Sequence, residues 1–155
     1  VARRSGFVLI ELIVVLGMLG VLLTFATVNL LGVQYRPSLA VAVDTLIADM
    51  KGQQTKAMSG VAGTSHSVYV GDDQYVLFAG NVYSAGDPAN APVPMDPNVA
   101  FSSVTFPGRQ IVFAQGSGDI VNFDPAYSAI TLLHAQSGEQ KSIRLNRYGA
   151  VVSIN

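Results

Sequence analysis

The stretch FVLIELIVVLGMLGVLLTFATVNLLGV, residues 7–33, decides the fold that the sequence predicts. Glu11 is its only charged residue, and apolar side chains occur all round a helix of this sequence rather than on one face. An α-helix rises about 1.5 Å per residue, so roughly 20 apolar residues cross a hydrocarbon core about 30 Å thick. The stretch therefore predicts a transmembrane helix. The alternative is a helix buried in the core of a soluble domain.

Two arginines, Arg3 and Arg4, precede the apolar stretch. Positive charge beside a membrane helix stays on the cytoplasmic side, so we expect a cytoplasmic N-terminus and a periplasmic or extracellular domain after Val33. An ordinary secretory signal has a shorter apolar region, about 7–15 residues, followed by a small-residue cleavage site. Because the run here is longer and no A-x-A site follows it, we expect the segment to be retained in the membrane as a single span.

The sequence SGFVLIELIVVLGMLG, residues 5–20, resembles the N-terminal signal of type IV pilins and pseudopilins. The likeness continues without a gap from Gly6 to Gly20. In that family a prepilin peptidase cuts after the Gly of a short basic leader, the new N-terminal residue is methylated, and a Glu occupies the fifth mature position. The resemblance implies cleavage between Gly6 and Phe7, N-methylation of Phe7 and an assembly role for Glu11.

Two positions depart from the common family pattern. Val8 replaces a frequent Thr, which is a mild change, and Val28 stands where many members have a Pro. Any helix melting that the family owes to that proline is therefore not implied for this chain.

Glu11 has a physical role to play if the leader is removed. A carboxylate within an apolar helix is costly unless it is paired, and cleavage creates a positive amine on Phe7. The sequence leaves three partners open for Glu11: the amine of a neighbouring subunit, the amine of its own chain, or water at the membrane interface.

The composition and the absence of known motifs argue against several classes of function. The chain has 155 residues and a formal net charge of −1, which becomes −3 when Arg3 and Arg4 leave with the leader, so no strong basic character points to nucleic acid. Cysteine is absent, which excludes thiol catalysis and cysteine metal sites. No G-x-S-x-G, P-loop or H-E-x-x-H motif occurs. We therefore expect neither an enzyme nor a cofactor or metal site.

An amphipathic helix is predicted after the apolar stretch. Pro37 should kink or interrupt the spine helix, and beyond it apolar residues recur at helical spacing with charged residues mostly off the stripe. The stripe consists of Leu39, Val43, Leu46, Ile47, Met50, Gln54 and Ala57, with Gln54 as its only polar member. It predicts a helix with one buried face in a domain that starts at about Pro37 and ends its helix near Ser59.

Period-two patterns after Thr64 predict an antiparallel sheet pair with the helix packed on it. Gly71-Asp72-Asp73 should turn the first hairpin, and the proline-rich residues 79–98 should form a long loop that is functional or mobile. The predicted strands are residues 65–70, 74–78, 100–106, 110–113, 120–123, 129–133, 141–146 and 150–154. A single long helix before a β-rich domain ending in LNRYGAVVSIN also resembles GspH/FimT-type minor pseudopilins and minor pilins, on pattern rather than on a motif.

Few other residues suggest chemistry. His66 and His134 can form a metal or catalytic pair only if the fold joins them. Asp119 and Asp124 flank a turn and can be read as calcium ligands, but no EF-hand spacing supports that reading, and turn chemistry is the more common role of such residues.

Lys141, Arg144 and Arg147 form a small basic cluster near the C-terminus. Such a cluster is usually a solvated surface. The functional alternative is an electrostatic contact with an acidic partner or with a DNA backbone.

The sequence as a whole predicts an α+β fold with a long N-terminal spine helix, half transmembrane and half amphipathic, packed on a C-terminal antiparallel sheet or sandwich domain. The expected parts are a prepilin leader (1–6), a transmembrane or filament-core helix (7–33), the amphipathic half of the spine (34–59) and a β-rich domain (60–155).

The expected function is a pilin-like structural subunit, a minor pseudopilin, of a type II secretion system or type IV pilus filament. Its expected partners are a prepilin peptidase, other pilin or pseudopilin subunits, the inner membrane and an assembly platform. The alternatives are a membrane-tethered periplasmic binding module that never polymerises and a minor pilin of a DNA-uptake filament.

Overall fold

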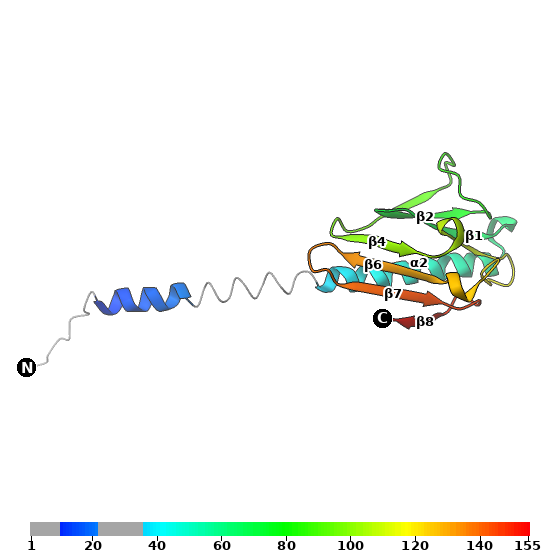
Figure 1. Ribbon diagram of the computed structural model, residues 1–155. Helices are drawn as coiled ribbons and strands as arrows, with labels where there is room; N and C mark the ends of the chain where they lie inside the picture. The colour runs from blue at the N-terminus through cyan, green and yellow to red at the C-terminus, as the bar shows by residue number, and fades with distance from the viewer. Residues whose placement is uncertain (1–9, 22–35) are drawn as a thin grey trace, which may run out of the picture. The chain divides into compact units, whose positions relative to one another are not determined.

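The computed structural model describes residues 10–21 and 36–155 of the chain. The chain divides into two compact units, Val1–Arg36 and Pro37–Asn155. Residues 10–21 of the first unit are helical, and the second unit combines a helix with two antiparallel sheets (Figure 1). The elements are α2 (Arg36–Met58), η1 (Val61–Gly63), β1 (His66–Val70), β2 (Gln74–Ala79), β3 (Ala91–Pro94), β4 (Val99–Val104), η2 (Pro107–Arg109), β5 (Gln110–Phe113), η3 (Pro125–Tyr127), β6 (Ala129–His134), β7 (Gln140–Leu145) and β8 (Val151–Ile154).

Helix α2 buries one face, as the apolar stripe predicted. Its buried residues recur every three or four positions: Leu39, Val43, Leu46, Met50, Gln53 and Ala57. Gln53 rather than Gln54 occupies the buried position, because a step of three from Met50 continues the stripe. Gly116 donates its backbone N–H to the carbonyl of Ala57 at 2.9 Å, which satisfies one of the acceptors that a helix end leaves free.

The two sheets each have four strands, in the orders β3-β2-β1-β5 and β4-β6-β7-β8, and all pairings are antiparallel. Their inward-facing residues join those of α2 in one hydrophobic core. Both sheets contribute aromatic or branched side chains, among them Val68, Tyr75, Phe113, Ile130 and Ile143. Each apolar side chain that is fully buried in this way stabilises the fold by about 1.5–3 kcal/mol.

Two segments differ from the strand prediction. Residues 91–94 lie within the predicted long loop, yet they form β3 at the edge of its sheet. Pro92 and Pro94 fit there because an edge strand leaves one side of its backbone without strand partners, so missing N–H groups cost little. Residues 120–123 were predicted as a strand, but only Ile120 makes an isolated bridge, with Phe113, because Asn122 adopts a positive φ of 53° that ends extended backbone.

The predicted fold class, with its long spine helix, is wrong. Among residues 10–21 and 36–155 the structure has two short helices and eight antiparallel strands, so the described chain is mostly sheet and contains no long apolar helix. The described part of helix α2 runs from Arg36 to Met58 and includes Pro37. The residues before Arg36, where a kink at Pro37 would have to be judged, lie outside the described part of the chain. Only one face of α2 is buried among the described side chains, and from Pro37 onward the helix belongs to the same compact unit as the sheets.

The predicted location in the inner membrane is also overturned. Within the two described ranges, no helix is both long and apolar enough to cross a membrane. Residues 7–9 and 22–33 of the predicted span lie outside the described residues.

Candidate functional site

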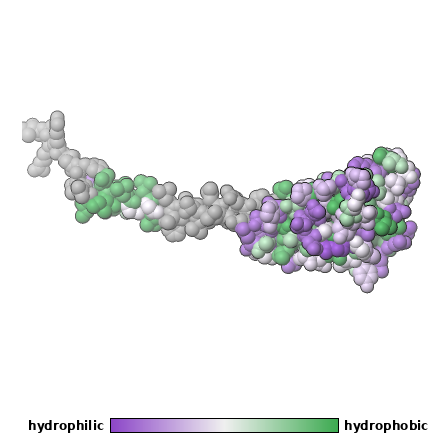
Figure 2. Space-filling view, turned by 90° about the horizontal axis from the view of Figure 1, so that it is seen from above, coloured by the Kyte–Doolittle hydropathy of each residue, from purple (hydrophilic) through white to green (hydrophobic). Residues whose placement is uncertain are grey.

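Glu11 lies in the helical segment of residues 10–21, and its side chain is exposed. The large apolar side chains of this segment are exposed as well, from 47% for Val15 to 67% for Ile10. Several are consecutive in sequence, so they occur on all sides of the helix, and Figure 2 shows the segment as mainly hydrophobic. The segment is therefore an exposed apolar surface that carries a single carboxylate.

Gly6 and Phe7, the predicted cleavage and methylation positions, lie outside the described residues. Their roles stay predictions. The described part of the signal begins at Ile10, so of the three residues predicted for processing and assembly the structure places only Glu11.

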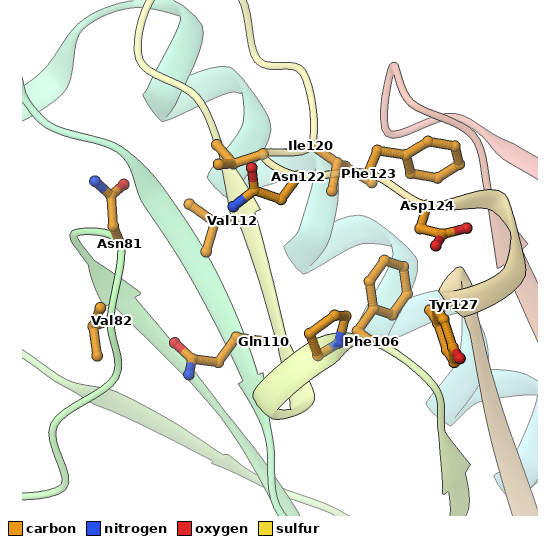
Figure 3. A pocket seen from close by; sticks show the side chains of 12 residues that line it. Asn81, Val82, Phe106, Gln110, Val112, Ile120, Asn122, Phe123, Asp124 and Tyr127 are labelled. Carbon is orange, nitrogen blue, oxygen red and sulfur yellow. The ribbon is translucent and has the colours of Figure 1, made fainter.

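A second candidate site is a pocket of about 380 Å³ in the compact unit, which we call the amide pocket after Asn81, Gln110 and Asn122 (Figure 3). It is formed where the loop after β2, the turn before β5, strand β5 and the segment between β5 and β6 meet. Figure 3 shows Asn81 and Val82 on one side of the strand that carries Gln110, and Asp124 and Tyr127 on the other. The remaining lining residues are Phe106, Pro107, Val112, Ile120, Val121 and Phe123.

Aromatic contacts hold one wall of the amide pocket in place. The ring of Tyr83 stacks on that of Tyr69 in β1, with centroids 4.1 Å apart and planes 5° from parallel, and it meets Phe78 edge-on at 5.6 Å. The backbone N–H of Tyr83 donates to Oε1 of Gln110 at 2.8 Å. These contacts fix the loop that carries Asn81 and Val82 against the outer face of the first sheet.

A helix cap and a left-handed turn fix the opposite wall. Oδ1 of Asp124 accepts a hydrogen bond from the N–H of Ala126 at 2.8 Å and so caps η3, which places Tyr127 at the rim. Asn122 adopts the left-handed conformation with φ 53°, which Asn tolerates better than most residues. This turn places Asn122 in the pocket lining (Figure 3).

The other residues singled out from the sequence are not brought together. Nε2 of His66 lies 3.0 Å from the carbonyl of Val61, and Nδ1 of His134, in the other sheet, accepts from the N–H of Ser137 at 3.1 Å. Each ring thus contacts backbone that is only three to five residues away in the sequence. Within residues 10–21 and 36–155, no three His, Asp or Glu side chains gather as a metal site requires.

The predicted calcium ligands serve other purposes. Asp119 lies 3.7 Å from Nε of Arg147, and Asp124 caps η3. The basic cluster is divided as well, because Lys141 and Arg144 are three residues apart on β7 and therefore project from opposite faces of the sheet.

The amide pocket was missed by sequence reasoning for a physical reason. Its polar residues lie at positions 81, 110 and 122, on three segments that only the sheet pairing brings together. One signal pointed near it, since loops as long as residues 79–98 are usually functional or mobile, and Asn81 and Val82 belong to that loop.

Comparison of the chain with protein-family models, with curated proteins and with solved structures finds no match.

Proposed function

We propose that the chain is a pilin-like structural subunit that assembles with copies of itself or with related subunits into a filament of a type II secretion system or type IV pilus. A prepilin peptidase processes it between Gly6 and Phe7. The observation that carries this proposal is the exposed apolar helical segment of residues 10–21, which carries Glu11, in a stretch that resembles the pilin signal without a gap.

An exposed apolar surface of this kind favours contact with another apolar surface. Monomeric proteins rarely expose contiguous apolar patches of more than a few hundred Å², and larger ones mark interaction sites. Burying one Leu, Ile, Val or Met side chain completely is worth about 1.5–3 kcal/mol. Packing the segment against the same segment of several other copies buries the apolar side chains on all of its sides. A partner that covers one face leaves the others exposed.

Glu11 gives this packing a defined register. A carboxylate among packed apolar helices requires a positive partner, because an uncompensated buried charge is strongly destabilising. The amine that cleavage creates on Phe7 is such a partner, either from a neighbouring subunit or from the same chain. Pairing between subunits sets the axial offset from one subunit to the next.

Site-specific disulfide cross-linking tests the packing. The chain has no cysteine, so a single Val14→Cys substitution introduces the only thiol. In cells that contain a prepilin peptidase and the assembly machinery, we expect Val14→Cys subunits to form disulfide-linked dimers in the filament fraction. The matched control is Tyr148→Cys, an exposed position in the compact unit. Equal and low cross-linking at both positions would contradict the proposal.

A further inference from the structure

We infer that the amide pocket binds a neutral, hydroxyl-rich ligand with an apolar face, a ligand of the saccharide class. The inference concerns the compact unit alone and does not depend on filament assembly. At about 380 Å³ the pocket lies within the range of about 300–1,000 Å³ that is typical of small-molecule sites.

The charges of the pocket exclude anionic ligands. Among the described residues that line it there is no Lys, Arg or His, and Asp124 is the single charged one. A phosphate or a nucleic-acid backbone requires cationic contacts and is repelled by a carboxylate. The ligand that fits these walls therefore carries no negative charge.

The backbone of the pocket excludes an added β-strand. Strand β5 is at the edge of its sheet, but the carbonyl of Val112 already accepts from the N–H of Val121 at 2.9 Å, and Phe113 bridges Ile120. An extended peptide binds a sheet edge through free main-chain groups. In this part of β5, main-chain groups are already bonded to residues 120–121. Recognition in the pocket therefore falls to side chains.

Those side chains offer donors and acceptors together. Within the described part of the chain, the side-chain amides of Asn81 and Asn122 make no hydrogen bond, and each carries two N–H donors and one carbonyl acceptor. Gln110 uses its Oε1 to accept from Tyr83, which leaves its N–H donors for a ligand. A hydroxyl group donates and accepts at once, so it can pair with both ends of an amide.

Aromatic rings supply the apolar side of the site. Tyr127 lines the pocket with 54% of its surface exposed, and Phe123 lines it half-buried, whereas Phe106 belongs to the core at 4% exposure and supports the wall from inside. The C–H face of a sugar ring packs on such rings, while its equatorial hydroxyls point towards polar groups. An exposed Tyr in the same pocket lining as partly unpaired amides is the combination that this class of ligand needs.

The test is an NMR titration of the full chain with three neutral probes, namely maltotriose, cellotriose and tri-N-acetylchitotriose. We expect at least one probe to shift the amide signals of Asn81, Gln110 and Asn122 in a saturable way, with a Kd of about 1 mM. Inorganic phosphate should leave these signals unchanged. Saturable binding of phosphate, or no saturable shift with any of the three probes up to about 10 mM, would overturn the inference.

Two variants assign the binding to these side chains. Asn122→Gly removes the amide but keeps the positive φ at no steric cost, and Asn81→Ala removes the amide from an exposed loop position where folding is not at stake. Each should weaken binding at least about tenfold, which corresponds to ~1.4 kcal/mol. Tyr148→Ala, an exposed tyrosine outside the pocket, should bind like the unchanged chain. Equal affinity in all four proteins would show that the sugar binds elsewhere and would also overturn the inference.

Discussion

The hydroxyl of Tyr75 in β2 donates a hydrogen bond of 2.5 Å to Oδ2 of Asp49 in α2. The Tyr75 ring is almost fully buried, so this bond ties the helix to the first sheet from inside the core. Burial raises the pKa of Tyr75 above its usual value near 10, and the hydrogen bond to Asp49 and the negative charge of Asp49 raise it further. The phenol therefore stays protonated in the folded protein at a pH where an exposed tyrosine ionises.

This contact predicts a loss of stability in alkaline solution. A group whose pKa is higher in the folded than in the unfolded state stabilises the fold fully below its unfolded pKa, and that stability falls as the pH rises beyond it. For Tyr75 the decline should begin at about pH 10. Urea unfolding at pH 8 and pH 11 measures it.

Tyr75→Phe is the variant that isolates the effect. At pH 8 it should lower the free energy of unfolding by about 1–3 kcal/mol, because Asp49 loses a partner, and its further loss between pH 8 and pH 11 should be smaller than that of the unchanged chain. Tyr148→Phe, at an exposed position, serves as the control. Identical pH profiles for the unchanged chain and Tyr75→Phe would contradict this reading of the contact.

Two adjacent glutamines of α2 should respond in opposite directions to the same substitution. Oε1 of Gln53 is buried and has no hydrogen-bond partner within the described residues, whereas Nε2 of Gln54 donates to the carbonyls of Gly118 at 2.9 Å and Tyr148 at 2.6 Å. A buried unpaired polar group costs about 1–3 kcal/mol. Gln53→Met should therefore stabilise the fold by about 1 kcal/mol.

Gln54→Met should destabilise the fold by about 1–3 kcal/mol, because it leaves two carbonyls without their donor. The two variants have the same composition, so the difference in their thermal unfolding midpoints reports the lost hydrogen bonds of Gln54 together with the relief of the buried oxygen of Gln53. Equal midpoints for the two variants would show that neither the unpaired oxygen of Gln53 nor the hydrogen bonds of Gln54 affect stability.

Gly149 and Gly138 provide a matched pair for close packing. Both have a positive φ, +68° and +70°, but a Cβ on Gly149 would lie 2.7 Å from Nε2 of Gln54 and 2.9 Å from Cε1 of Phe113, whereas a Cβ on Gly138 would meet nothing within 4 Å. Gly138→Ala should cost about 1–2 kcal/mol from backbone strain alone.

Gly149→Ala should cost a further 1–3 kcal/mol or so, because Gln54 and Phe113 must move. Urea unfolding of both variants gives the difference directly. A cost for Gly149→Ala no greater than that for Gly138→Ala would mean that the turn moves away from α2 without penalty.

Much of the sheet unit was predictable because local signals decide it. The Gly71-Asp72-Asp73 turn between two alternating runs predicted the hairpin of β1 and β2, and the structure confirms that hairpin. The predicted bounds of β5 are confirmed as well. Both results rest on side-chain alternation and turn residues, which act over a few positions.

The failures have longer-range causes. The prolines of β3 signal a loop in the sequence, and only the edge position of that strand makes them acceptable. Apolar residues at 120–123 suggested a strand, but the left-handed conformation of Asn122 ends the extended backbone, and these residues line the amide pocket instead. The convergence of Asn81, Gln110 and Asn122 follows from the pairing of β1 with β5, which a pattern of single residues does not contain.

Glu11→Ala should still be processed but should fail to join filaments. Without the carboxylate, the new amine of Phe7 is left without its partner, at a cost of about 3 kcal/mol, so incorporation should fall by about 100-fold. Immunoblots of the sheared filament fraction at equal expression measure it, with Glu139→Ala, another exposed carboxylate, as the control. Incorporation of Glu11→Ala equal to that of Glu139→Ala would leave Glu11 without an assembly role.

The central claim, that the chain is a processed pilin-like subunit, depends most directly on its mature N-terminus. Mass spectrometry of the full chain, produced alongside a prepilin peptidase, measures that terminus. The predicted result is a chain that begins at an N-methylated Phe7 and has lost VARRSG, while Gly6→Val retains the leader. An unmodified chain that still carries residues 1–6 in the presence of active peptidase would contradict the account.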